Sequence, residues 1–205
     1  MEGPVTVAVT GPFASGKSTL VRFLGELPGT ETTSADEIVH HLLKNDRQTI
    51  SRIVERFGED VRGSDGIDRK VLGREVFGDA GALRDLEEIL HPLVRSETDR
   101  RIEASMAELF VVEIPLLFET GRGGDFAITV AVTVPEERRR AWAAGRGLDE
   151  AALQAVEARQ LSGEEKARRA DLVVQNDGDP DRLKEQAYDL GRMIMRERGS
   201  NGNPR

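Results

Sequence analysis

The chain of 205 residues contains no cysteine. This absence excludes a disulfide framework, a thiolate metal site and a cysteine nucleophile, so packing alone must hold the fold together. Long hydrophobic runs are missing as well, because the longest, 109–112 and 126–134, fall far short of the ~20 residues that span a bilayer. The N-terminal Met-Glu-Gly-Pro has neither the basic region nor the apolar core of a secretion signal. We therefore expect a cytoplasmic protein that does not enter a membrane.

An excess of positive charge is also lacking. Acidic residues outnumber basic ones by 37 to 29, which gives a formal net charge of -8. A chain of this charge repels polyanions unless its cations are gathered locally, so we expect no binding to nucleic acid. Hydrophobic residues make up 38% of the chain, enough for a packed core, and the length predicts one domain with an insertion. We expect a monomer.

Hydrophobic periodicity predicts an α/β fold with three layers and a five-stranded parallel sheet. The predicted strands are 5–10, 30–33, 109–112, 126–134 and 172–174. The third and fourth are nearly continuous apolar runs, which is typical of strands that are covered on both faces. From residue 38 to residue 106 the apolar residues follow helical spacing only, so an all-helical insertion is predicted there.

These patterns divide the chain into four parts. An α/β core is predicted at 1–35, 108–135 and 166–198, with the helical insertion at 36–107. Residues 136–165 are rich in arginine and poor in apolar side chains, which predicts a solvated excursion or a mobile lid. Polar residues and glycine dominate 199–205, for which we expect disorder.

The chemistry is carried by Gly11-Pro12-Phe13-Ala14-Ser15-Gly16-Lys17-Ser18, which fits the P-loop pattern G-x-x-x-x-G-K-[ST] between a predicted strand and a predicted helix. Backbone amides at a helix N-terminus attract phosphate oxygens, and a side chain at Gly16 would obstruct their approach. Lys17 can contact the β and γ phosphates, and the Ser18 hydroxyl is a suitable Mg²⁺ ligand. ATP with Mg²⁺ is therefore expected, bound by Gly11, Ala14, Ser15, Gly16, Lys17, Ser18 and Thr19.

The P-loop does not define the acceptor of the γ-phosphoryl group. A switch GTPase would carry a guanine-reading N-K-x-D segment, and the sequence has none. Transfer to a small acceptor fits better, because the helical insertion supplies a pocket and the arginine-rich stretch a lid. Two alternatives stay open at this point: a nucleoside monophosphate kinase, and a P-loop regulator that binds nucleotide without transfer.

Further motifs extend from the second strand to the last. They are Ala35-Asp36, Asp65-Gly66 with Arg69, Leu72 and Phe77, Leu90-His91-Pro92-Leu93, Ile114-Pro115-Leu116-Leu117-Phe118-Glu119, Arg159-Gln160, Glu165-Lys166, Ala170-Asp171 and Asn176. On these residues the chain resembles the dephospho-CoA kinase family. The resemblance implies transfer of the ATP γ-phosphate to the ribose 3′-hydroxyl of dephospho-CoA, the last step of coenzyme A synthesis. The sequence departs from the family pattern at Pro12, Ala14, Ser34 and His40.

The resemblance also implies roles for individual residues. Asp36 would be the catalytic base, although acidic residues are common in the first turn of any helix. Arg146, and with weaker support Arg159, would offset charge on the transferred phosphoryl group, unless they are ordinary surface ion-pair partners. Lys17 joins Asp36 and Arg146 in the predicted catalytic set. Ser34 is interpreted as a helix cap in capping-box spacing with Glu37.

The acceptor is predicted to contact Asp36, His91, Glu113 and Leu117. His91 beside a proline is equally a packing residue, and Leu117 would shape the pocket by packing. Glu113 follows a buried strand at the carboxyl edge of the sheet, where an acid can also hold Mg²⁺ through water, together with Ser18. Lys166 and Asn176 match the family pattern, yet a surface lysine and a turn asparagine explain them equally well.

Overall fold

The computed structural model describes residues 3–201, with side chains through residue 197. The chain forms two compact units: an α/β unit of residues 1–33 and 105–205, and a helical unit of residues 34–104. Within residues 3–201, no helix combines the length and apolar character that crossing a bilayer requires.

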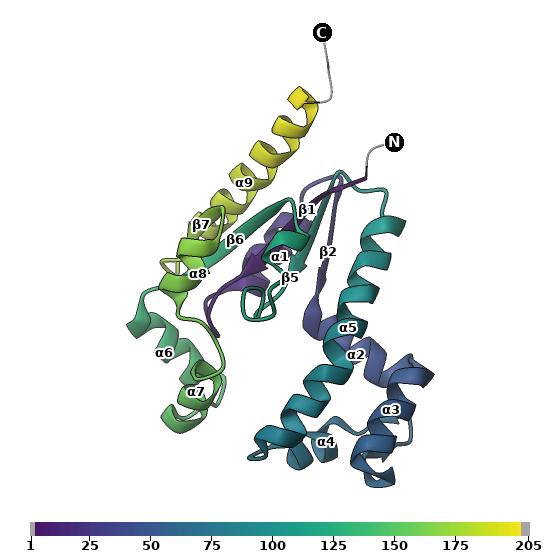
Figure 1. Cartoon of the computed structure of the whole chain (residues 1–205). Coiled ribbons are helices and arrows are strands. Elements are labelled where there is room, and N and C mark those ends of the chain that lie inside the picture. The colour runs from purple at the N-terminus through teal and green to yellow at the C-terminus, as the bar shows by residue number, and fades with distance from the viewer. Residues whose placement is uncertain (1–2, 202–205) are drawn as a thin grey trace. The chain divides into compact units, whose positions relative to one another are not determined.

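The α/β unit contains the predicted five-stranded sheet (Figure 1). Its strands are β1 (Val5–Thr10), β2 (Thr30–Ser34), β5 (Leu109–Glu113), β6 (Ile128–Thr133) and β7 (Leu172–Gln175). Their order is β2-β5-β1-β6-β7, and β1 pairs in parallel with both β5 and β6, while β6 pairs in parallel with β7. The predicted strands and the α/β class are confirmed. The continuous apolar run of β5 is buried along its whole length, as a central parallel strand requires.

Helices α1 (Lys17–Gly25) and α9 (Pro180–Asn201) pack against each other beside the sheet (Figure 1). Their apolar faces form the main core with alternate residues of the strands, among them Val7, Val9, Leu20, Leu183 and Ile194. Helix α9 continues to Asn201, whereas the sequence pattern led us to expect a disordered tail from residue 199. The rest of the expected tail, 202–205, lies outside the described residues.

Three further helices belong to the α/β unit. They are α6 (Glu136–Gly145), α7 (Glu150–Glu157) and α8 (Gly163–Arg169), and a 3₁₀ turn η2 (Gly123–Asp125) precedes β6. Helix α8 packs on β6, whereas α6 and α7 make up the arginine-rich stretch. Asp149 caps α7 by accepting a hydrogen bond from the Ala152 amide at 2.8 Å, which fixes the start of that helix.

The helical unit is made of α2 (Ala35–Asn45), α3 (Arg47–Phe57), η1 (Glu59–Val61), α4 (Arg69–Val76) and α5 (Ala80–Ala104). It has its own core, which includes Leu43, Ile53, Val61, Leu72 and Leu90. The expectation that this part is all-helical is wrong in one detail, because β3 (Arg62–Gly63) and β4 (Gly66–Ile67) form a small antiparallel hairpin. Gly66 permits it with φ +98, and a side chain there would meet the backbone of Leu43 and Lys44.

Candidate active site

The P-loop connects the end of β1 to the start of α1. Gly16 precedes α1 with φ +92 and provides no side-chain cap for the amides of the first helical turn. Ala14 adopts φ 59, which is rare for a residue with a side chain. The Ser15 amide donates to the Pro12 carbonyl at 3.2 Å, and the Thr19 amide donates to the Gly16 carbonyl at 3.1 Å. The amides of Ser15 and Thr19, two of the predicted phosphate-binding residues, therefore already donate to backbone carbonyls of the P-loop.

Lys17 folds back over the loop. Its Nζ donates to the Pro12 carbonyl at 2.9 Å, and only 7% of the residue is exposed. An ammonium in this position lies beside the loop amides that favour anions. The Lys17 ammonium can donate to a phosphate oxygen in place of the Pro12 carbonyl, because both oxygens accept a hydrogen bond from an N–H group.

Ser18 and Glu113 lie together at the carboxyl edge of the sheet. The Ser18 hydroxyl donates to Glu113 Oε1 at 3.0 Å, and Glu113 is the last residue of β5 and is 9% exposed. A hydroxyl and a carboxylate are hard oxygen ligands that suit Mg²⁺, which commonly completes its shell with waters and substrate phosphates. No group of three or more His, Asp or Glu side chains able to hold a metal occurs within residues 3–201. The pair therefore fits a magnesium ion that depends on the nucleotide for most of its ligands.

Asn176 supports the P-loop from the opposite end of the chain. Its Nδ2 donates to the Ser15 carbonyl at 2.9 Å, its Oδ1 accepts from the Gly178 amide at 3.0 Å, and it is 4% exposed. A Cβ atom at Gly16 would lie 2.2 Å from Asn176 Nδ2. Asn176 therefore also shapes the phosphate-binding loop. In the sequence, only the family resemblance pointed to a role for this residue.

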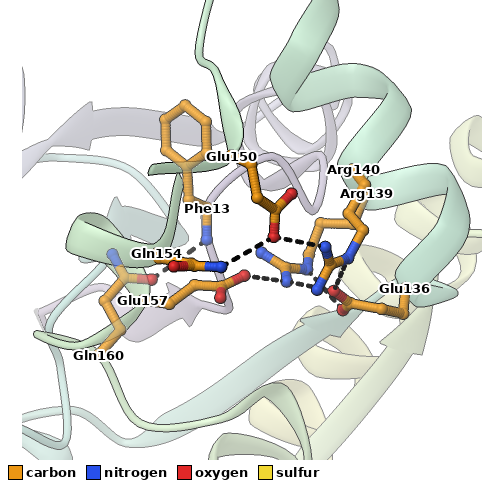
Figure 2. Close-up of polar contacts among 8 residues, drawn as sticks. All are labelled: Phe13, Glu136, Arg139, Arg140, Glu150, Gln154, Glu157 and Gln160. Atoms are coloured by element: carbon orange, nitrogen blue, oxygen red, sulfur yellow. Dashed lines mark hydrogen bonds and ion pairs between the residues drawn. The ribbon is translucent and has the colours of Figure 1, made fainter. Parts of the chain in front are cut away.

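The arginine-rich stretch contacts the P-loop through Phe13. The Phe13 amide donates to Gln160 Oε1 at 3.1 Å (Figure 2), and the guanidinium carbon of Arg146 lies 5.7 Å from the centroid of the Phe13 ring. A small apolar cluster of Ala14, Ala143 and Leu153, with Phe13 and Trp142 against it, joins the loop to α6 and α7. The stretch is therefore not only solvated surface, because its few apolar residues face the loop.

Two other arginines of this stretch tie α6 to α7 (Figure 2). Arg139, which is 6% exposed, donates to Glu136 and to Glu157, while Arg140 donates to Glu136 and to Glu150. The hydrogen bonds that Arg139 donates to Glu136 raise the pKa of Arg139 above its ordinary value; Glu157 acts in the same direction, and burial opposes both. Ion pairing thus accounts for these two arginines, whereas the exposed Arg146 lies against Phe13.

The burial of Lys166 differs most from what the sequence suggested. A surface lysine was one explanation, but the side chain is 0% exposed, and its Nζ lies 2.8 Å from Glu119 Oε1 and donates to the Pro115 carbonyl. Lysine has almost no tendency to be fully buried without a partner. Glu119, the last residue of the motif Ile114–Glu119, is therefore the ion-pair partner of Lys166, which belongs to another motif. Leu117, from the predicted acceptor set, is also 0% exposed.

In the helical unit, Ser34 and Glu37 form the expected capping box at the start of α2. The Glu37 amide donates to Ser34 Oγ at 3.0 Å, and the Ser34 amide donates to Glu37 Oε2 at 3.1 Å. Asp36 lies in the first turn with its side chain exposed. His91 on α5 is exposed as well, so packing does not account for it.

The sheet order, with a P-loop between β1 and α1 and an acid at the end of the neighbouring β5, defines a P-loop nucleotide-binding protein. The family model of dephospho-CoA kinase matches residues 5–181. A dephospho-CoA kinase from Symbiobacterium thermophilum is 41% identical over 88% of this chain and 77% of that protein. The chain belongs to the dephospho-CoA kinase family, and it is an ATP-dependent kinase.

Solved structures agree with this assignment. A Thermus thermophilus protein superposes with a TM-score of 0.78 at 32% identity, over 92% of this chain and 97% of that chain. The dephospho-CoA kinase from Campylobacter jejuni gives a TM-score of 0.63 at 26% identity, over 92% and 96% of the two chains. The family expected from the motifs is confirmed.

Proposed function

We propose that this chain transfers the γ-phosphoryl group of ATP to the ribose 3′-hydroxyl of dephospho-CoA, which yields ADP and coenzyme A. The observation that carries the proposal is the P-loop with Ser18 against Glu113, in a chain that matches one kinase family over residues 5–181. The bond from Pγ to the β,γ-bridging oxygen breaks, and a bond from the 3′ oxygen to Pγ forms. The hydroxyl proton must leave to a base.

ATP binding falls to the P-loop. The backbone amides of the loop and the α1 dipole hold the phosphates, and Lys17 moves from the Pro12 carbonyl to the β and γ oxygens. Ser18 and Glu113 would hold Mg²⁺, which offsets phosphate charge when it is bound. Arg146 leaves the Phe13 ring to contact the γ-phosphoryl oxygens, since a planar guanidinium matches their geometry. Residues 136–165, the lid segment, carry this arginine.

Proton removal falls to Asp36 in the helical unit. Its exposed carboxylate lies in the first turn of α2 and can accept the proton of the attacking hydroxyl. We assign acceptor binding to residues 34–104, including His91, and to Glu113 in the α/β unit. The fully buried Leu117 shapes the acceptor pocket through packing rather than by direct contact.

An acceptor screen tests the reaction. ADP release is measured with MgATP and dephospho-CoA, AMP, CMP or no acceptor, and phosphorus NMR locates the new phosphate. We expect turnover with dephospho-CoA and a 3′-phosphate product. Turnover with AMP or CMP alone would make the chain a nucleoside monophosphate kinase, and nucleotide binding without any transfer would make it a regulator.

The role of Asp36 is tested with Asp36→Asn. Loss of the base should lower kcat on the order of 10²- to 10⁴-fold while the Kd for ATP is unchanged. Glu37→Gln is the matched control, because it removes the adjacent carboxylate and glutamine still completes a capping box. A near-normal kcat for Asp36→Asn, or equal losses in both variants, would refute the assignment.

A further inference from the structure

An ion pair with a fully buried lysine has no part in the proposed reaction. Lys166 on α8 is 0% exposed, and its Nζ contacts Glu119 Oε1 at 2.8 Å. Burial lowers the pKa of Lys166, and the hydrogen bond that Lys166 donates to Glu119 opposes this effect. Replacing such a pair by apolar residues is often neutral for stability, so stability alone does not explain why a fold keeps one.

Lys166 also reaches the start of the P-loop. Its Nζ donates to the Pro115 carbonyl, and the same carbonyl accepts a hydrogen bond from the Thr10 hydroxyl at 3.3 Å. Thr10 is the last residue of β1 and precedes Gly11, the first residue of the P-loop. One carbonyl oxygen thus joins the segment after β5, helix α8 and the strand that leads into the loop.

Glu119 reaches the other side of the P-loop. Its Oε1 accepts a hydrogen bond from the Leu161 amide at 2.7 Å. The preceding residue, Gln160, accepts the hydrogen bond from the Phe13 amide at 3.1 Å (Figure 2). Two successive residues at the end of the lid segment are therefore fixed, one to the buried pair and the other to the P-loop backbone.

We propose that Lys166 and Glu119 are positioning residues that hold the P-loop in its nucleotide-binding shape, through Pro115 at its start and through Gln160 at Phe13. Neither residue touches the substrates. Glu119 fixes the backbone at Leu161, which places the Gln160 side chain, and Gln160 restrains a loop in which Ala14 adopts a rare φ of 59. The same contacts connect the lid segment to the loop that binds ATP. The inference rests on the proposed function of the P-loop.

The test measures nucleotide affinity apart from turnover. Gln160→Leu removes the acceptor for the Phe13 amide, and Lys166→Met removes the charge with little change in volume. The Kd for a non-hydrolysable ATP analogue with Mg²⁺ is measured by titration calorimetry. We expect it to rise about tenfold in each variant, the equivalent of one lost hydrogen bond. The matched control is Lys184→Met, which breaks an exposed ion pair with Glu26 at the C-terminal end of α1 and should leave the Kd unchanged.

Kinetics separate positioning from general damage. The KM for ATP should rise as the Kd does, while kcat at saturating ATP and the KM for dephospho-CoA stay within about twofold. Unchanged affinity in Gln160→Leu, or parallel losses for both substrates, would overturn the proposal. If Lys166→Met fails to fold, Glu119→Gln takes its place, because it removes the charge that pairs with Lys166, and an unchanged Kd in that variant would overturn the proposal. If the unmodified chain binds the analogue but does not phosphorylate dephospho-CoA, the proposed function fails while the Kd values still decide the positioning role.

Discussion

Gly16 faces the side-chain amide of Asn176 so closely that a single methyl group there should disturb the P-loop. A Cβ at this position would lie 2.2 Å from Asn176 Nδ2, and the backbone has φ +92. Holding alanine at a positive φ costs on the order of 1–2 kcal/mol. Displacing Asn176 breaks its 2.9 Å bond to the Ser15 carbonyl, which costs about 1–3 kcal/mol more in a buried site.

Gly16→Ala should therefore lower the free energy of unfolding by roughly 2–5 kcal/mol, measured by urea denaturation and by Tm. The affinity for an ATP analogue should fall with it, because the loop backbone moves. Gly73→Ala on α4 is the matched control: it has no positive φ and no atom within 4 Å of the added methyl group. That variant should be neutral or stabilised by about 0.5–1 kcal/mol, since alanine is the better helix former.

A double-mutant cycle with Asn176→Ala isolates the contact. Once Asn176 is truncated, Gly16→Ala should cost only its backbone strain, so the double variant should be about 1–3 kcal/mol more stable than the two single losses predict. Additivity within about 0.5 kcal/mol would refute the reasoning, because it would show that the methyl group does not displace Asn176.

Two further predictions concern charged residues. Arg146→Ala should lower kcat roughly 10- to 1000-fold with Tm nearly unchanged, because Arg146 is exposed; a large fall in Tm at constant kcat would make it structural. Arg100, helped by Arg101, lowers the pKa of Glu97 to about 2, so its stabilisation is present above pH 4.5 and is lost as the pH falls toward 2. Glu97→Gln should therefore lower stability in urea on the order of 1–2 kcal/mol at pH 7, allowing for the exposed arginines, and progressively less below pH 4.5; a difference independent of pH would contradict this.

The sheet and the P-loop could be predicted from sequence because their signals are local. The continuous apolar run of β5 indicates burial on both faces, and the P-loop octapeptide lies between a strand pattern and a helix pattern. The hairpin of β3 and β4 was missed because two-residue strands are too short to show alternation. The turn between them was visible, since Gly63 and Gly66 mark it. Local pattern therefore carries a signal for the turn but none for the pairing.

The buried polar residues could not be predicted in this way. Lys166 lies in a charged run that reads as helix surface, and its partners Glu119 and Pro115 are 47 and 51 residues away in the sequence (166 - 119 and 166 - 115). Burial of a charge depends on such distant partners, so periodicity around Lys166 carries no information about it. The motif resemblance singled out these positions without indicating their role.

Gly16 of the P-loop pattern shows a second limit of prediction from local sequence. The pattern alone explains Gly16 by the approach of phosphate, which concerns the ligand. The structure adds a constraint from within the fold, because Asn176, 160 residues further along (176 - 16), occupies the space that a Cβ would need. What position 16 tolerates is therefore set jointly by nucleotide and by the turn after β7. A substitution there can damage the loop before any ATP arrives, so binding and stability must be measured together to assign a loss to either cause.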